Sequence, residues 1–252
     1  MQAYASDFAP VYNKLWGWFS NQLAPRILDY YQSFPISQWN RNVLDVCCGT
    51  GQLAAHFLKN GYRVIGIDSS EGMLRIAREN NADCVQADQA QFVCADAACF
   101  ALHTQVGLAV STYDALNHLE DMDALRGCFH SVFASLADEG VFVFDLNTRK
   151  GLQSWNGISI EDSRDAVLIN RGIFDEGMGR ATVRITGFIP LENGTYERFE
   201  ETAFNTLFDV AAVKATLEET GWRQVHFARS NDLSKPVDDT EAERRIFIVA
   251  QR

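Results

Sequence analysis

The sequence has 252 residues, of which 47% are hydrophobic and 22% are charged, and its formal net charge is −11. This length and composition fit one globular domain, or one domain with an inserted subdomain. The negative charge argues against broad contact with nucleic-acid phosphates or an anionic membrane, since both need a basic face. No apolar run approaches the ~18 residues of a membrane-spanning helix, so no transmembrane segment is expected.

The N-terminus carries no basic stretch followed by an apolar one. We therefore expect no secretory signal peptide and a cytoplasmic protein. The six cysteines include no Cys-x-x-Cys pair, and the five histidines show no metal-ligand spacing. Reduced cysteines and no metal site are expected.

Residues 1–40 are rich in aromatic side chains and precede the first expected strand. The pattern predicts one helix over residues 10–19, with Pro10 in its first turn, and a second helix over residues 25–31. Two interpretations are open. The aromatic side chains pack on the domain as ordinary core, or the segment forms a lid over a binding site.

Residues 42–54, NVLDVCCGTGQLA, predict a buried strand, a glycine turn and the start of a helix. Gly49 and Gly51 permit a tight turn and the close approach of a ligand, because neither has a Cβ. The spacing also fits the G-x-G-x-x-A pattern of dinucleotide sites. However, Asp45 lies just before the turn, where it would repel a pyrophosphate and attract a cationic amine.

The run Asp45-Val46-Cys47-Cys48-Gly49-Thr50-Gly51 closely resembles motif I of the class I S-adenosylmethionine (SAM)-dependent methyltransferases, usually hydrophobic-x-D/E-x-G-x-G-x-G. Cys47 replaces the first glycine of the family, and because cysteine is small we expect the turn to form. The resemblance implies SAM as cofactor, with Asp45 near its α-ammonium, and S-adenosylhomocysteine (SAH) as product. The alternative is an ordinary glycine-rich turn that binds no ligand.

The run from Phe8 to Leu15 resembles the "fA-x-x-YD-x-l" opening of small-molecule methyltransferases of this class. In these enzymes an N-terminal helical segment folds over the site. Asn13 stands where the family usually has Asp. The resemblance implies that Tyr12 faces SAM and supports the lid interpretation.

Residues 62–68 predict a second strand that ends at Asp68. An acid at this place can accept hydrogen bonds from both ribose hydroxyls of an adenosine, whether in SAM or in NAD. The alternative is that Asp68 begins the next helix, predicted over residues 71–80. Ser69 or Ser70 is the expected cap of that helix.

The adenine end of the cofactor is expected near Met73 and after a short third strand over residues 83–87. Met73 belongs to a match with the family's S-x-x-M-L, and it lies at the adenine face or in the core. The resemblance implies that Asp88, with Gln89 beside it, lies near the adenine amino group. A solvated loop acid is the alternative for Asp88.

Residues 106–111 predict a fourth strand, and the polar segment 112–119 follows it. The carboxyl end of a parallel strand points into the ligand crevice, so this segment is the expected acceptor side. It resembles the "fDsLnyl" segment of small-molecule methyltransferases. This implies that Ser111 and Asp114 lie near the methionine part of SAM or near the acceptor, although Asp114 could instead cap a helical turn.

Three side chains are candidates for catalysis. His118 is a possible general base, and a structural role is its alternative. Tyr113 comes from the same segment, and Asn147 follows a fifth strand predicted over residues 141–146, after a helix over residues 121–137. Both are expected to face the same crevice.

Residues 151–206 lose helical periodicity and predict three or four antiparallel strands, including strands over 166–174, 180–189 and 195–207. We expect an insertion after strand five that covers the acceptor or forms a homodimer contact. Its arginines either line a pocket for an acidic acceptor or lie on a solvated strand face. They are Arg171, Arg180, Arg184 and Arg198.

Residues 209–221 predict a last helix, and strands are predicted over 222–228 and 245–250. If adjacent, these two strands must pair antiparallel, because a loop joins them. The class I methyltransferase sheet ends in this way, whereas a dehydrogenase sheet normally continues parallel. The predicted fold is α/β: a doubly wound, seven-stranded, mostly parallel Rossmann-like sheet with an antiparallel last strand, plus a small antiparallel β insertion.

The expected activity is SN2 transfer of the SAM methyl group to a nitrogen or oxygen of a small-molecule acceptor. Residues 1–40 form the lid, 41–150 with 207–252 the SAM-binding domain, and 151–206 the insertion. The alternatives are an NAD(P)-dependent oxidoreductase and a non-catalytic protein that binds SAM or a partner. The expected cofactor-binding residues are Tyr12, Asp45, Cys47, Gly49, Thr50, Gly51, Asp68, Ser69, Met73, Asp88, Gln89, Ser111 and Asp114.

Overall fold

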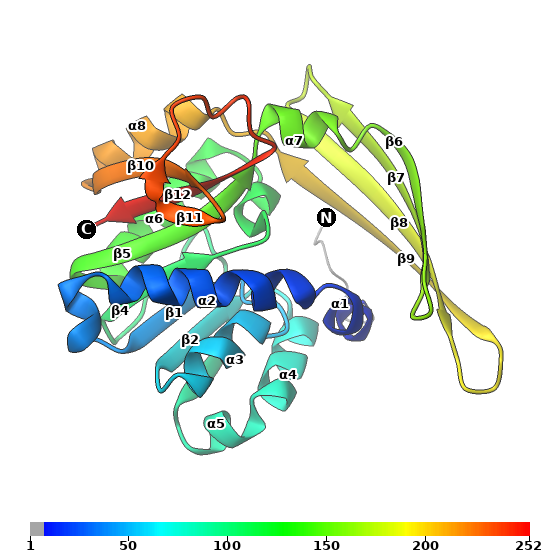
Figure 1. Ribbon diagram of the computed structural model, residues 1–252, viewed down its shortest axis with the longest axis horizontal. Helices are drawn as coiled ribbons and strands as arrows, with labels where there is room; N and C mark the ends of the chain where they lie inside the picture. Colours follow the sequence, from blue (N-terminus) through cyan, green and yellow to red (C-terminus); the bar gives the residue numbers. More distant parts are fainter. Residues whose placement is uncertain (1–7) are drawn as a thin grey trace.

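The computed structural model describes residues 8–252, in which a helix-covered central sheet carries a second, smaller sheet at one side (Figure 1). The predicted lid segment therefore falls partly on residues 1–7, outside the described residues. None of the helices in the described part of the chain is long and apolar enough to span a membrane.

The central sheet has eight strands in the order β11-β10-β12-β5-β4-β1-β2-β3. Strands β1 to β5 pair parallel with one another, whereas β12 pairs antiparallel with both β5 and β10. The predicted fold class is confirmed, with the short edge strand β11 as an unpredicted addition. The strands are β1 Asn42–Val46, β2 Arg63–Asp68, β3 Ala90–Cys94, β4 Val106–Ser111, β5 Leu136–Asn147, β10 Arg223–Arg229, β11 Asp232–Pro236 and β12 Arg245–Gln251.

Helices cover both faces of this sheet, and their ends follow the capping residues of the sequence. Ser70, Asp121 and Asp209 each accept a hydrogen bond from a backbone N–H in the first turn of the helix that follows. Gly221 ends the last helix in the left-handed conformation. The helices are α3 Gln52–Lys59, α4 Glu71–Asn80, α6 Met122–Ser135 and α8 Val210–Thr220.

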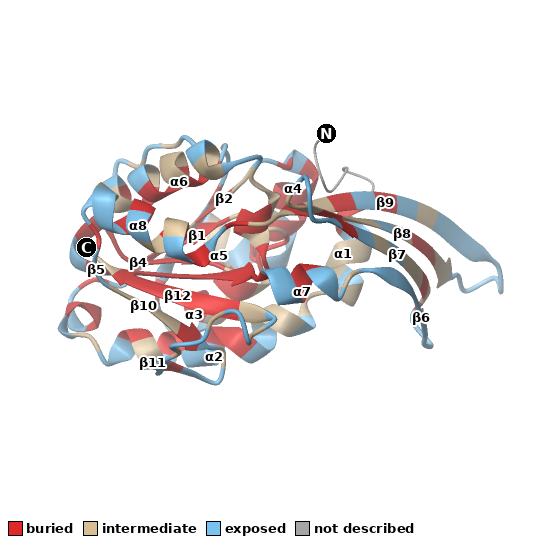
Figure 2. Cartoon of the chain, turned by 90° about the horizontal axis from the view of Figure 1, so that it is seen from above, coloured by how far each residue is buried: buried red, intermediate tan, exposed pale blue. Residues whose placement is uncertain are grey.

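The core has two layers because successive side chains of a strand point to opposite faces of the sheet. Val43 of β1 belongs to the cluster that packs against α3 and the N-terminal helix α2 (Trp18–Gln32), and the next residue, Leu44, to the cluster under α6 and α8. Figure 2 shows this buried centre, and it also shows that the far end of the smaller sheet is exposed. The larger body therefore provides a rigid support for loops at its edge.

The N-terminal helices differ from the prediction. They are α1 Ala9–Leu15, α2 Trp18–Gln32 and the 3-10 turn η1 Pro35–Gln38. Pro25 lies inside α2 rather than at the start of a helix. Pro25 is exposed, whereas Leu23, Ile27 and their neighbours on the apolar face are buried against the body, so packing outweighs the hydrogen bond that proline removes.

The predicted third strand over residues 83–87 is wrong, because that segment is the short helix α5 Ala82–Gln86, with no buried residue. The third strand is β3, in which Ala90 and Phe92 alternate inward and pair beside β2. The helix predicted to reach residue 137 also ends earlier. Leu136 already pairs with Val106 as the first residue of β5.

The insertion is a separate antiparallel sheet in the order β6-β7-β8-β9, as predicted. It follows a short unpredicted helix, α7 Arg149–Gln153, and its hairpins turn at residues 175–180 and 190–196. In Figure 1 the sheet curves away from the body, with α1 beside it, and Phe8 contacts Phe199 of β9 with ring centroids 5.6 Å apart. The strands are β6 Gly157–Asp162, β7 Val167–Asp175, β8 Arg180–Pro190 and β9 Tyr196–Thr206.

Candidate functional site

A cavity of about 420 Å³ lies at the carboxyl ends of the parallel strands, where ligands bind in open α/β sheets. Its wall comes from the β1–α3 turn, the end of β2, the segments after β3 and β4, and single residues of α1 and β9. Eight of the predicted site residues line it: Tyr12, Cys47, Gly49, Asp68, Ser69, Met73, Tyr113 and His118.

The β1–α3 turn forms with cysteine in place of the usual glycine. Cys47 has φ +58°, in the left-handed region that glycine favours, and its side chain lines the cavity. At Gly49, φ +53°, an added Cβ would point toward Tyr12 of α1, 3.7 Å away. At Gly51 it would lie 2.9 Å from Asn81. Gly49 therefore opens the cavity, whereas Gly51 allows α3 to pack closely on α4.

Asp68 lies at the end of β2 and is fixed in place by backbone groups. Its Oδ2 accepts a hydrogen bond from the Gly49 N–H at 2.9 Å, and its Oδ1 accepts one from the Ser70 N–H at 2.9 Å. Burial raises the pKa of Asp68, and these N–H groups act in the opposite direction. The carboxylate is thus oriented at the cavity wall, next to Ser69.

Asp45 lies behind the turn and is almost fully buried, with 3% of its surface exposed. Burial, and then the charge of Asp68, raises the pKa of Asp45 to about 8, although the Ala54 N–H acts against this shift. Among the described residues no group hydrogen-bonds to its Oδ2. Thr50, Gly51 and Asp45 support the turn without lining the cavity.

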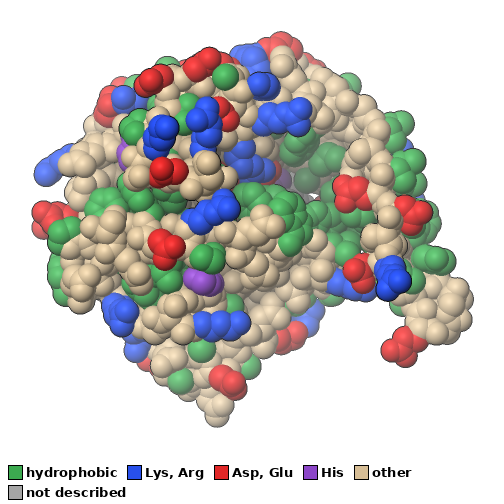
Figure 3. All heavy atoms as spheres, viewed as in Figure 1, with side chains coloured by type: hydrophobic (Ala, Val, Ile, Leu, Met, Phe, Trp, Pro, Cys, Tyr) green, Lys and Arg blue, Asp and Glu red, His purple; other side chains and the backbone are tan. Residues whose placement is uncertain are grey.

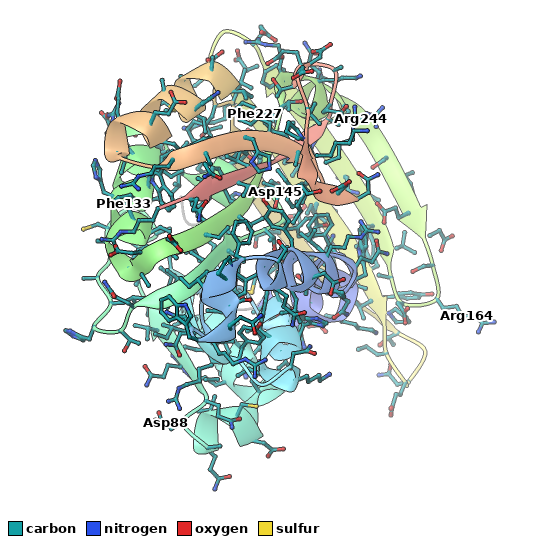
Figure 4. The ribbon with its side chains drawn as sticks, turned by 60° about the vertical axis from the view of Figure 1, so that its left-hand side comes forward. Asp88, Phe133, Asp145, Arg164, Phe227 and Arg244 are labelled. Carbon is teal, nitrogen blue, oxygen red and sulfur yellow. The ribbon has the colours of Figure 1, made fainter. Side chains whose placement is uncertain are left out.

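The structure does not bring Asp88 and Gln89 to the site. Both precede β3, and Asp88 pairs with Arg63 in solvent, with 76% of its side chain exposed (Figure 4). The segment after β3, beginning with Asp96, lines the cavity instead. Asp96 Oδ1 accepts a hydrogen bond from the Ala98 N–H at 2.8 Å. Placing the third strand at residues 90–94 from its alternating pattern would have identified this acid.

A second cavity of about 240 Å³ adjoins the first and shares Tyr12, Tyr113 and His118 with it. Its other wall is the inserted sheet, represented by Val183 of β8 and Ala203 of β9. Figure 3 shows a hollow between the body and this sheet, with hydrophobic side chains gathered in it. Predicted residues Asp114 and Asn147 also line the second cavity rather than the first.

A charged cluster under the second cavity was not predicted. Arg245, the first residue of β12, pairs with Asp114 at 2.5 Å and with Asp145 of β5 (labelled in Figure 4). Asp145 in turn accepts hydrogen bonds from the N–H groups of Tyr113 and Asp114, at 2.6 and 3.0 Å. Tyr113 and Asp114 both have positive φ, 70° and 50°, so this cluster holds a strained turn in place.

His118 lies between the two cavities and is buried. Burial lowers the pKa of His118, while Asp114 and a hydrogen bond to the Phe204 backbone act in the opposite direction. Its imidazole is therefore neutral at pH 7. Asn147 is tied by its side-chain amide to Asn205 at 2.8 Å.

The other predicted residues are placed as follows. Tyr12 lies on α1, whose next residue, Asn13, accepts hydrogen bonds from Gln52 at 2.7 Å and from Asn80 at 2.9 Å. These bonds fix α1 across the turn. Met73 is buried and packs with Phe8 in a small cluster. Ser111 is fully buried at the end of β4 and lines neither cavity.

Comparisons with known proteins agree with this geometry. A family model described as a methyltransferase domain matches residues 43–140. A protein of Geobacillus sp. (strain WCH70), provisionally named a methyltransferase, is 25% identical over 245 residues, covering 93% of this chain and 97% of the relative.

Solved structures share the fold over nearly the whole chain. A SAM-dependent methyltransferase from Clostridium acetobutylicum ATCC 824 matches with a TM-score of 0.80 at 20% identity, covering 97% of each chain. The sugar N-methyltransferase KedS8 from Streptoalloteichus sp ATCC 53650 matches with a TM-score of 0.77 at 18% identity, covering 100% of this chain and 94% of the other. Residues 43–140 thus match a methyltransferase domain, and nearly the whole chain has the fold of these methyltransferase structures.

Proposed function

We propose that this protein transfers the methyl group of SAM to a nitrogen of a small-molecule acceptor. The observation that carries the proposal is the pair of adjoining cavities. One has an acidic wall at the glycine turn, the other lies under the inserted sheet, and Tyr12, Tyr113 and His118 line both.

The first cavity suits SAM in its charges. SAM carries an α-ammonium and a sulfonium and no phosphate. Asp68, Asp96 and Glu120 line the cavity, and no Lys or Arg does so among the described residues. A nicotinamide dinucleotide would bring its pyrophosphate against these acids, so the charge pattern also argues against an NAD(P)-dependent oxidoreductase.

Individual groups suit the parts of SAM. Asp68 would accept hydrogen bonds from the ribose hydroxyls, and Asp96 from the adenine amino group. No described group hydrogen-bonds to the buried Oδ2 of Asp45, and the ammonium of SAM would favour the ionised form of this carboxyl. A buried acceptor of this kind is costly without a partner, and a cation near it offsets the cost.

When bound, SAM supplies an electrophilic methyl carbon, which passes to the acceptor in one displacement while the C–S bond electrons return to sulfur. The residues of this chain contribute alignment and exclusion of water. Tyr12 and Tyr113 provide aromatic walls at the junction of the cavities. A protonated amine must lose its proton before it can attack, and this requires a base.

His118 is suited to receive that proton. Its pKa is lowered by burial, so the ring is neutral, and its hydrogen bond to the Phe204 backbone fixes the ring. It lies where the two cavities meet. The fold relative KedS8 is named as a sugar N-methyltransferase, which supports an amine as the acceptor group.

The test is formation of SAH from SAM in the presence of a pool of small amines and amino sugars, with the methylated product detected by mass. His118→Gln is expected to lower kcat by about 100-fold, because general base catalysis contributes on this scale. SAM affinity should be retained. The matched control is His103→Gln, at an exposed loop histidine outside both cavities. SAM binding without any SAH formation would instead support a non-catalytic SAM-binding protein.

A further inference from the structure

A third cavity adjoins the second cavity under the inserted sheet. The third has a volume of about 400 Å³ and shares Trp16, Trp155, Val183 and Ile185 with the second. The outer cavity thus extends the acceptor site away from the glycine turn. An acceptor that fills both cavities carries a second ring or chain beyond the reacting amine.

The strand register sorts the charges of the inserted sheet onto opposite faces. Arg171 of β7 lies opposite Arg184 of β8, which lies opposite Thr202 of β9, so these three share one face. Arg180 and Arg198 fall on the same face by the two-residue period of a strand. Val183, Ile185 and Ala203, which line the cavities, belong to the other face. For Arg171, Arg184 and Arg198 the register supports the strand face that turns away from the second and third cavities. Arg180 instead contacts Glu120 and Phe204, which line the first cavity.

Three of the four arginines are paired with carboxylates, and Arg171 donates a hydrogen bond to the Thr186 hydroxyl on the same face. Arg184 and Arg198 both pair with Glu200, at 2.5 and 2.8 Å. Arg180 pairs with Glu120 at 3.0 Å. They therefore offer no cation to a ligand on the inner face.

The inner face carries acid and neutral polar groups instead. Glu161, Ser159 and Asn170 line the outer cavity, and Asn170 Nδ2 lies 3.5 Å from Glu161 Oε1. No Lys or Arg lines this cavity among residues 8–252. Arg245 lines the second cavity, but it lies between Asp114 and Asp145.

The charge of Glu161 affects Tyr113, which lines the second cavity. Burial is the main cause that raises the pKa of Tyr113, and the charges of Asp114 and Glu161 act in the same direction. Trp16 and Trp155 line both the second and the third cavity. Aromatic faces with nearby hydroxyl, amide and carboxylate groups suit a polyhydroxylated ring or a cation.

Building on the proposed function, we propose that the acceptor is a neutral or cationic molecule, such as a glycoside of an amino sugar, whose non-reacting part lies in the outer cavity against Trp155, Ser159 and Glu161. Acceptors that carry a phosphate or a nucleoside diphosphate are rejected. The reason is that such an anion would lie beside the Glu161 carboxylate, and no Lys or Arg among the described residues lines this cavity to pair with it.

The experiment uses two matched acceptors: the methyl glycoside of an amino sugar and the 1-phosphate of the same sugar. SAH formation gives kcat/KM for each. The glycoside should be preferred by at least about tenfold, since like charges across a binding surface are strongly unfavourable. Ser159→Lys should reduce this preference about tenfold or more by supplying a cation, and Glu161→Gln should reduce it less. The control, Arg184→Gln on the outer face, should leave the ratio unchanged.

A second measurement decides the inference if neither sugar is methylated. Caesium and iodide ions quench tryptophan fluorescence, and the part due to Trp155 is the difference between the protein and Trp155→Phe. Each quenching constant of Trp155 is divided by that of free tryptophan amide with the same ion. The resulting ratio should be higher for caesium than for iodide, because the Glu161 carboxylate attracts cations, and Glu161→Gln should lower the caesium ratio. Stronger quenching by iodide, or a preference for the sugar phosphate, overturns the inference. SAM binding, measured separately by calorimetry, shows whether the proposed function itself has failed.

Discussion

Cys47 takes a backbone conformation that an L-residue adopts at a cost. Its φ of +58° lies in the left-handed region, which costs roughly 1–2 kcal/mol for a residue with a Cβ. The family motif has glycine at this position. The turn nevertheless forms, because Cys48 N–H bonds to Ile67 O at 2.9 Å and Gly51 N–H bonds to Cys48 O at 3.0 Å. The surrounding hydrogen bonds thus hold Cys47 in place.

This strain predicts that glycine and alanine substitutions have opposite orders of stability at Cys47 and at Cys48. At Cys47, glycine should give a more stable protein than alanine by about 1 kcal/mol, because it removes the left-handed strain. At Cys48, which has no positive φ, alanine should be more stable than glycine by about 0.5–1 kcal/mol. Urea unfolding of the four variants measures both differences. The same order of stability at both positions would contradict the strain at Cys47.

Asp45 predicts a pH dependence of stability. Its folded pKa, about 8, lies well above the usual value for an unfolded Asp. The folded protein therefore binds the proton more tightly, so the contribution of Asp45 is fully present below about pH 4 and is lost as the pH rises through about 8. Asp68 and Asp145 have pKa values raised in the same direction.

The expected result is a free energy of unfolding that falls between about pH 5 and pH 8, with Asp45 contributing up to about 1.4 kcal/mol per pH unit. Asp45→Asn cannot ionise and should show a smaller slope over that range. Denaturant unfolding of both proteins at several pH values makes the comparison. Equal slopes in the two proteins would mean that Asp45 is ionised in the folded state throughout this range.

At the scale of elements, the predictions were most accurate where several local signals agree. For α4, an apolar stripe and a serine cap gave residues 71–80, as observed. For β4, an uninterrupted apolar run gave residues 106–111. Residues 83–87 were predicted as a strand, although they fall mostly in α5, because so short a segment shows no clear helical or strand periodicity. The prediction also broke α2 at Pro25, although the buried face of α2 continues through it.

Contacts between distant elements could not be predicted from local pattern. Arg245 begins an apolar strand, and its role depends on pairing beside Asn147 of β5. Only this pairing brings it to Asp114 and Asp145. Asp114 was predicted as a site residue, but its neighbours in this cluster, Asp145 and Arg245, were not.

The cluster predicts a large effect of Arg245→Met on stability. This change leaves two buried carboxylates without their cation, and breaking a buried pair costs about 3–5 kcal/mol. The matched control is Arg229→Met, which removes an exposed pair with Glu243 and should cost less than about 1 kcal/mol. Urea unfolding compares them. If the two changes cost the same, the cluster does not hold the Tyr113–Asp114 turn.

At the scale of the whole molecule, the site is assembled from three parts of the chain. The body provides the glycine turn and Asp68, α1 provides Tyr12, and the inserted sheet provides the wall beyond His118. The sequence indicated the first part through its motif, Tyr12 through resemblance and the inserted sheet through its alternating pattern. Which face of the inserted sheet points to the cavities could not be predicted. Both faces of its strands carry polar residues, and a shift of one residue in the strand register exchanges the two faces.

The central claim is that the cavity at the glycine turn binds SAM through Asp68. Isothermal calorimetry with SAM, SAH and NAD tests it most directly, on the protein and on the Asp68→Ala and Asp88→Ala variants. We expect micromolar binding of SAM and SAH and none of NAD.

Asp68→Ala should bind SAM about 10–100-fold more weakly, because the ribose hydroxyls lose their buried acceptor. The variant should remain folded, with a melting temperature lowered by the loss of the hydrogen bonds from Gly49 and Ser70. Asp88→Ala, altered in solvent away from the cavity, should bind as the unaltered protein does. Binding of NAD, or equal SAM affinity in the Asp68→Ala variant, would contradict the account.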